Sequence, residues 1–184
     1  MKKKIDSLIQ SKSFVKVFID KEDVNIEKTD GIIMFQNENF IVMSDTYDFF
    51  YCGMKLIRKK DISEIRNSDN EKVFNEIMKA EKLTDLHIEL FNKYKIDFSD
   101  FKSLFNSLKF QNLPIIIECQ YGKNDRFILG SIFEINEKNV RIEYINSRAE
   151  YDLIPTKVLY KDITTVCWDG QYTNLFYKYA KRIE

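Results

Sequence analysis

The pattern of apolar runs and turns in the first half of the chain recurs in the second half at an offset of about 100 residues. Gly31 aligns with Gly130, and the run Lys60-Asp61-Ile62 aligns with Lys161-Asp162-Ile163. A fixed offset that holds along a chain indicates two copies of one structural unit. We therefore predict an internal duplication, which restricts each half to a small and complete fold.

The segment from Phe127 to Trp168 shows most clearly what this unit is. Within it, the run VRIEY at residues 140–144 alternates apolar and charged side chains, which is typical of a half-buried strand. Gly130 lies inside an apolar run, where a glycine usually marks a bend or a close approach of two backbones. The turns between these runs are short, so neighbouring strands are expected to be antiparallel, because parallel pairs need long crossovers.

The composition is that of a globular protein, since 44% of the 184 residues are hydrophobic and 32% are charged. The 29 basic and 29 acidic side chains balance, which argues against a nucleic-acid module that works by net positive charge. No apolar run approaches the roughly 20 residues of a membrane-spanning helix. The N-terminal MKKKIDSLIQ has no signal-peptide core, and the three cysteines show no CxxC spacing. We expect a cytoplasmic protein with no membrane partner.

Neither glycine nor proline occurs between Met54 and Leu113, which favours helices in the middle of the chain. Residues 67–69 supply N-cap chemistry for the first of them. The predicted domains are residues 1–70, a first small β-barrel with an N-terminal helix; residues 71–110, a helical connector; and residues 111–184, a second small β-barrel with a C-terminal helix. Whether the connector is one helix or several stays open at this point.

In residues 104–168 a short helix precedes an apolar strand that ends at Gly122. Gly130 then lies in a bent strand, and a hairpin leads to VRIEY. This order resembles the Sm-like and SH3-like small barrels, and residues 7–66 resemble them less closely. The resemblance implies an α+β fold of two five-stranded antiparallel β-barrels, joined by a helical connector and followed by a C-terminal helix.

Sm proteins bind RNA through an Asp-x-x-Met-Asn turn and a later Arg-Gly step. The corresponding turn here reads Asn136-Glu137-Lys138-Asn139-Val140, and the later segment reads Val158-Leu159-Tyr160-Lys161-Asp162. Both signatures are missing, so the RNA-binding residues of that family carry over to no position of this chain. The resemblance predicts a fold and no ligand, because small barrels host many functions.

One candidate binding surface combines a predicted loop at residues 45–51 with the basic strand that follows it. Its aromatic and basic members are Tyr47, Phe49, Phe50, Tyr51, Lys55, Arg58, Lys59 and Lys60. Aromatic rings stack on bases and cations meet phosphates, so single-stranded RNA or DNA is one possible ligand. Alternatively, the aromatic side chains pack beneath the loop and the lysines keep an edge strand from pairing with another chain.

A second candidate surface is the equivalent loop of the second half, residues 147–152. Arg148 and Tyr151 belong to residue types that are enriched at binding hot spots. The alternative interpretation of this loop is a solvated hairpin tip.

The sequence contains no recognisable catalytic, cofactor or metal motif. His87 is the single histidine, which favours a packing or surface role over a metal site. No nucleophile elbow, P-loop or dinucleotide-binding motif occurs. Cys119 takes the place of Ile19 in the repeat, which predicts a buried cysteine in the core. We therefore expect no catalytic residues, no cofactor and no metal.

These observations favour a non-enzymatic cytoplasmic interaction protein of an adaptor or immunity type. Its loops or sheet edges would bind a protein partner or a second copy of the chain. The alternative is a single-stranded RNA or DNA binder that uses the first candidate surface. An enzyme with a carboxylate site is a third hypothesis, which no motif supports.

Overall fold

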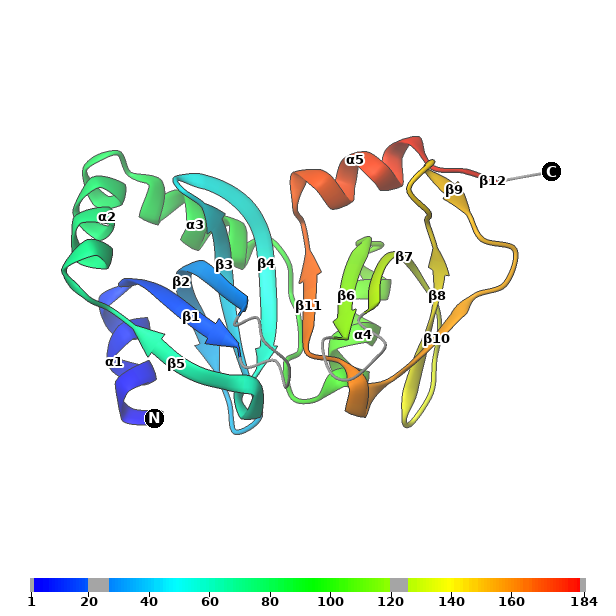
Figure 1. The fold of residues 1–184 in the computed structure, drawn as a ribbon, viewed down its shortest axis with the longest axis horizontal. Helices are drawn as coiled ribbons and strands as arrows, with labels where there is room; N and C mark the ends of the chain where they lie inside the picture. Colours follow the sequence, from blue (N-terminus) through cyan, green and yellow to red (C-terminus); the bar gives the residue numbers. More distant parts are fainter. Residues whose placement is uncertain (1, 20–26, 120–125, 183–184) are drawn as a thin grey trace. The chain divides into compact units, whose positions relative to one another are not determined.

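The computed structural model describes residues 2–19, 27–119 and 126–182 (Figure 1). The chain divides into two compact units, Met1–Tyr94 and Lys95–Glu184. None of the helices in the described ranges is long and apolar enough to cross a membrane.

The first unit is an antiparallel sheet with helices before and after it in the sequence. Its strands lie in the order β4-β3-β2-β1-β5. Its elements are α1 (Lys2–Ser11), β1 (Phe14–Ile19), β2 (Glu27–Gln36), β3 (Phe40–Tyr47), β4 (Phe50–Arg58), the 3-10 turn η1 (Lys59–Asp61), β5 (Ile62–Arg66), α2 (Asp69–Ala80) and α3 (Leu83–Asn92).

The second unit repeats this order of strands as β10-β8-β7-β6-β11. Its elements are α4 (Phe101–Phe110), β6 (Ile115–Cys119), β7 (Arg126–Ile135), β8 (Asn139–Tyr144), β9 (Glu150–Tyr151), β10 (Thr156–Leu159), η2 (Tyr160–Asp162), β11 (Thr165–Trp168), α5 (Gln171–Tyr179) and β12 (Lys181–Arg182). The short strands β9 and β12 form a separate parallel pair.

The α+β class is confirmed, but the prediction of two closed five-stranded barrels of the SH3-like or Sm-like type is wrong. Each unit contains an open antiparallel sheet. In the first unit, β4 and β5 stand at opposite ends of the strand order, and no pairing joins them within the described ranges. The sequence pattern did not distinguish these folds, because alternation reports which side chains are buried and is the same for an open and a closed sheet.

Helices cover both faces of the sheet in the first unit. On one face, Ile5 and Leu8 of α1 pack into a cluster with strand residues such as Val15. On the other face, Phe14 belongs to a cluster with Met78 of α2. Neighbouring residues of β1 therefore pack into clusters on opposite faces of the sheet, because successive side chains of a strand alternate between its faces. A sheet that is covered on both faces forms packed layers and need not close on itself.

Two glycines allow neighbouring strands to approach closely. A Cβ atom at Gly31 would lie 2.0 Å from the carbonyl oxygen of Ser44, and one at Gly130 would lie 2.0 Å from that of Glu143. Gly31 also has a φ of 153°, a backbone conformation that residues other than glycine rarely adopt. The close backbone approach predicted at Gly130 is confirmed.

The middle of the chain forms several helices. α2 and α3 are separated by a break in which Lys82 is left-handed, with a φ of 57°. The N-cap predicted at residues 67–69 is confirmed, since Ser68 caps α2 and Glu71 completes a capping box. Cys119 is buried, as predicted from the repeat.

Candidate functional site

The β3–β4 hairpin of the first unit ends in a two-residue turn. Tyr47 and Phe50 are its last cross-strand pair, and Asp48 and Phe49 connect them. Asp48 has a φ of 53°, a left-handed conformation that short polar residues tolerate. Two-residue hairpin turns need such a conformation, because it matches the twist of the flanking strands. The residues from Asp45 to Tyr47, predicted as part of a loop, are therefore paired strand.

Tyr47 and Phe50 are exposed at the end of this hairpin. Their exposed fractions are 74% and 75%. Directly opposite residues of an antiparallel pair lie on the same face of the sheet, with their Cβ atoms about 5 Å apart. The two rings therefore form one exposed surface, which we call the aromatic tip (Tyr47 and Phe50).

Phe49 packs the turn against α2 of the same unit. Its ring stacks on Phe74 of α2, with 4.9 Å between the ring centroids and 19° between the planes. The Phe74 ring stacks in turn on Phe14 of β1, with 5.2 Å between the centroids. Phe14 is buried in the core. Stacked rings contribute beyond the area they bury, so this series of three rings holds the turn against the helix and the sheet.

Tyr51 contacts the single histidine. The rings of Tyr51 and His87 meet edge to face, with 5.6 Å between their centroids. His87 Nδ1 lies 2.7 Å from the hydroxyl of Ser44. Burial lowers the pKa of His87 to about 4, so the imidazole is neutral at pH 7 and acts as a packing residue.

A pocket of about 330 Å³ lies next to the turn. Strand residue Lys16 is paired with Asp30 on one side and with Arg66 on the other. These three charged side chains therefore leave the sheet on the same face. The full lining of this charged pocket is Phe14, Lys16, Asp30, Asp48, Arg66, Asn70, Glu71, Val73 and Phe74.

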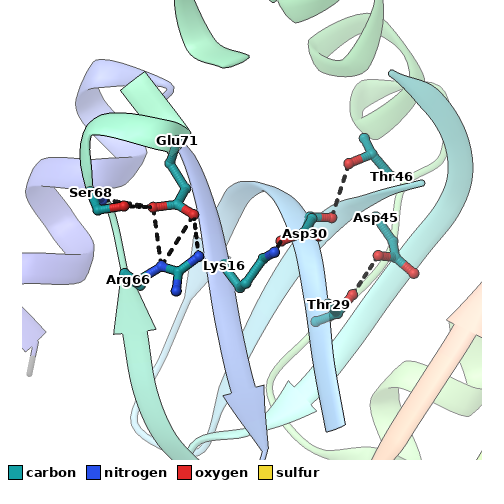
Figure 2. Close-up of polar contacts among 8 residues, drawn as sticks. All are labelled: Lys16, Thr29, Asp30, Asp45, Thr46, Arg66, Ser68 and Glu71. Carbon is teal, nitrogen blue, oxygen red and sulfur yellow. Dashed lines mark hydrogen bonds and ion pairs between the residues drawn. The ribbon is translucent and has the colours of Figure 1, made fainter. Parts of the chain in front are cut away.

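Two ion pairs line the charged pocket (Figure 2). Lys16 Nζ lies 3.2 Å from Asp30 Oδ1. Arg66 donates from Nη2 to Glu71 Oε1 at 2.8 Å, and from Nε to the two carboxylate oxygens at 3.2 and 3.3 Å. The second pair is bidentate, which is the stronger and more directional arrangement for a guanidinium and a carboxylate.

Glu71 is the most deeply buried charged residue of the pocket, with 3% of its surface exposed. Ser68 donates to Glu71 Oε2 from its backbone N–H at 2.7 Å and from its hydroxyl at 2.6 Å. Burial alone would raise the pKa of Glu71, but the hydrogen bonds from Arg66 and Ser68 outweigh it and lower the pKa to about 2. Glu71 therefore stays ionised and joins the end of β5 to the start of α2.

The formal charges in the pocket do not balance. The three carboxylates of Asp30, Asp48 and Glu71 face the two cations of Lys16 and Arg66. Each cation already has a carboxylate partner. Asp48 is exposed, and within the described ranges its carboxylate forms no ion pair.

Two of the predicted basic binding residues have carboxylate partners inside the fold. Lys55 Nζ lies 3.1 Å from Asp45 Oδ2. Thr29 also donates to Asp45 (Figure 2). Arg58 Nε lies 2.6 Å from Asp61 Oδ2, and both of these residues are buried. Both side chains are therefore part of the structure of the first unit.

The remaining basic residues lie far from the aromatic tip. Lys59 donates to the carbonyl of Asn37 at 2.5 Å, and burial lowers its pKa, whereas Lys60 is exposed. Both follow the end of β4, a nine-residue strand that starts at Phe50. At about 3.3 Å per residue, roughly 30 Å of strand separates them from the tip. The structure thus brings Tyr47 and Phe50 together, but places Lys59 and Lys60 elsewhere.

The second candidate surface is divided between a structural and an exposed residue. Tyr151 is half-buried in a core cluster, and the guanidinium of Arg182 lies 4.9 Å from the centroid of its ring. Arg148 is exposed and forms an ion pair with Glu150 at 2.9 Å. Only Arg148 is available on the surface without rearrangement of the fold.

Sequence reasoning missed the charged pocket. Lys16 and Arg66 lie in strands, where alternating charged residues are usually solvated, and Asp48 lies in a turn. The one usable signal was Lys16 within the apolar run of residues 14–19. It is in phase with Phe14, which is buried, so a polar partner on the same face was to be expected.

Comparison with known proteins assigns no family to the chain, because no protein-family model, curated protein or solved structure matches it. Over the residues that the structure describes, no group of three or more His, Cys, Asp and Glu side chains is arranged to hold a metal ion. Functional inference therefore rests on the aromatic tip and the charged pocket.

Proposed function

We propose that the chain is a non-enzymatic interaction protein and that the aromatic tip of its first unit docks a protein partner. The observation that carries this proposal is the exposure of Tyr47 and Phe50, about three-quarters of each side chain, at the end of a fixed hairpin. Aromatic residues on a rigid support are typical anchors of protein interfaces, because they bury a large area and lose little conformational freedom.

The support of the tip is rigid before any partner binds. The stack of Phe49 on Phe74 and of Phe74 on Phe14 holds the turn. A preorganised anchor lowers the entropy that docking costs. The hairpin is thus suited to recognition without a conformational change.

An exposed apolar side chain of α2 lies beside the pocket that the turn lines. Val73 lines the charged pocket together with Asp48, and 54% of its surface is exposed. Asp48 also directly follows Tyr47 and precedes Phe50, so a partner that contacts the turn can meet an aromatic ring and a carboxylate of neighbouring residues. This mixture of an aromatic anchor and a polar rim is the usual anatomy of a protein interface.

A protein fits this site better than a single-stranded nucleic acid. Lys55 and Arg58 have carboxylate partners, and Lys59 and Lys60 lie at the other end of β4. The basic residues predicted to hold phosphates are therefore not grouped beside the aromatic rings, as a groove that follows the backbone would require. The nucleic-acid hypothesis stays testable by the salt dependence that phosphate contacts impose.

The test is capture of partners by the tagged full chain from its native cells, quantified by mass spectrometry. The tip variant is Tyr47→Ser/Phe50→Ser. A matched control removes two other exposed rings, Phe110→Ser/Tyr179→Ser, whose exposed fractions are 88% and 63%. We expect proteins that the wild type and the control capture alike and that the tip variant captures about tenfold less.

Two results would contradict the proposal. One is a set of captured proteins that does not change in the tip variant. The other is an equal loss in the tip variant and the control, since this would show general surface adhesion. In a parallel titration with a fluorescent single-stranded oligonucleotide, we expect no tight binding at about 50 mM salt. Salt-sensitive binding that the tip variant loses would replace the protein partner by a nucleic acid.

A further inference from the structure

Among the described residues that line the pocket, Asp48 is the charged one whose side chain has no ion-pair partner. It lies in the turn between the two residues of the aromatic tip. Lys16 and Arg66 are bound to Asp30 and Glu71, so neither cation is free to neutralise it. A ligand group that enters this pocket therefore meets a surplus of one negative charge.

The start of α2 lines the same pocket but does not favour an anion. Helix N-termini attract anions through free backbone N–H groups. Here, the carboxylate of Glu71 already occupies this position, where it accepts hydrogen bonds from Ser68 and Arg66. An incoming anion would have to displace an internal carboxylate whose bonds are short.

The walls of the pocket suit a long side chain with a cationic end. Phe14, Val73 and Phe74 provide apolar contact for methylene groups, and the carboxylates of Asp30 and Asp48 line the same space. A volume of about 330 Å³ lies at the lower end of the range for ligand pockets, which begins near 300 Å³. A planar guanidinium, with five donors, can address more than one carboxylate at a time.

We propose that the charged pocket receives an arginine side chain of the protein partner, with Asp48 as the carboxylate that binds its guanidinium. This assignment rests on the proposed docking at the aromatic tip. The tip would contact apolar groups of the same partner across the turn, in which Asp48 connects the two rings to the pocket. The partner would therefore present both an arginine and apolar groups on the surface that contacts this turn.

The test is an NMR titration of the ¹⁵N-labelled full chain with N-acetyl-arginine amide. N-acetyl-citrulline amide is the matched control, because it has nearly the same shape and no charge. We expect saturable shifts of the backbone amide signals of Asp48, Phe49, Asn70 and Val73 with the arginine probe. We expect the citrulline probe to bind at least about fivefold more weakly, since it forms no charge-assisted bond.

The matched variants are Asp48→Asn and Asp152→Asn. Asparagine tolerates the left-handed conformation of the turn, so Asp48→Asn removes the charge and keeps the backbone. Asp152 is an exposed carboxylate of the second unit. We expect about fivefold weaker arginine binding for Asp48→Asn and unchanged binding for Asp152→Asn. An equal response to both probes, or unchanged binding in Asp48→Asn, would overturn the pocket assignment.

The two proposals fail in distinguishable ways. If the arginine probe does not bind but the tip variant still loses its captured proteins, the pocket assignment is wrong and docking at the tip stands. If the arginine probe binds through Asp48 but the tip variant captures the same proteins as the wild type, docking at the tip is wrong. In that case, the assignment of the pocket to the partner is overturned as well.

Discussion

The ring of Phe49 stacks on the ring of Phe74, with 4.9 Å between their centroids, and this contact joins the β3–β4 turn to α2. Phe49 follows Asp48 and precedes Phe50 in the sequence. The same contact therefore fixes the carboxylate that lines the charged pocket and a ring of the aromatic tip. Substitutions can therefore separate the contribution of these residues to stability from the binding role that we propose for them.

Replacement of Phe74 by alanine should destabilise the first unit, because it removes the middle ring of the stack. Full burial of a Phe side chain is worth about 3–5 kcal/mol, and Phe74 is half-buried, so we expect a loss of about 2 kcal/mol in the free energy of unfolding. Urea unfolding followed by circular dichroism measures this. The tip variant Tyr47→Ser/Phe50→Ser should change stability by less than about 0.5 kcal/mol. A larger loss in the tip variant than in Phe74→Ala would refute this division of roles.

Substitution of Glu71 by glutamine should lower stability and remove a pH dependence. The pKa of Glu71 is about 2 in the folded chain, below its ordinary value of 4.5. Its contribution is therefore complete above pH 4.5 and is lost as the pH falls towards 2. We expect Glu71→Gln to lower the free energy of unfolding by about 2 kcal/mol at neutral pH. The urea midpoint of the variant should then depend less on pH across that acid range. The same acid-induced decrease in both proteins would show that Glu71 is not its source.

Substitution of His87 by glutamine should act in a different pH range. The pKa of His87 is lowered by burial from 6.5 to about 4. The unfolded chain then binds the proton more readily, so stability is complete above pH 6.5 and falls as the pH drops towards 4. The wild type should therefore lose about 3 kcal/mol of stability between pH 6.5 and 4. Glutamine cannot take up this proton, so we expect the stability of His87→Gln to lack this pH dependence. Chemical unfolding of both proteins at closely spaced pH values checks this. The same dependence of the free energy of unfolding on pH in both proteins above pH 4 would contradict it.

Gly31→Ala and Gly130→Ala should each destabilise the unit that contains the substitution. The added Cβ would lie 2.0 Å from a backbone oxygen, which no side-chain movement can relieve. We expect a loss of at least about 3 kcal/mol in each case, measured by thermal or urea unfolding. A loss below about 1 kcal/mol would mean that the two strands separate easily at that position.

Local chemistry was predictable from the sequence because it depends on neighbours in the chain. Residues 67–69 were predicted to cap the first helix of the connector, and Ser68 does so in a capping box with Glu71. Gly130 interrupts an apolar run and proves to be the point where two backbones meet. Cys119 was assigned to the core through its partner position in the repeat, and it is buried.

Arrangement in space was not predictable in the same way. Residues 45–51 were interpreted as a loop, so the register of the hairpin was unknown. Asp45 faces Gly53 and Met43 faces Lys55 across the two strands, which makes Asp45 and Lys55 diagonal neighbours and explains their ion pair. Without this register, Lys55 looked like a surface cation. Closure of the sheet was unpredictable for the same reason, because it depends on pairing between strands far apart in sequence.

The most direct measurement of the central claim is site-specific photo-crosslinking in native cells. Benzoylphenylalanine replaces Phe50 in one protein and the still more exposed Phe110 in another, so that each presents a large aromatic group to solvent. We predict that position 50 yields a discrete covalent adduct with a protein, which position 110 does not form, and that Asp48→Asn reduces its amount. Identical adducts from both positions, or none from position 50, would contradict the proposal that the aromatic tip binds a partner.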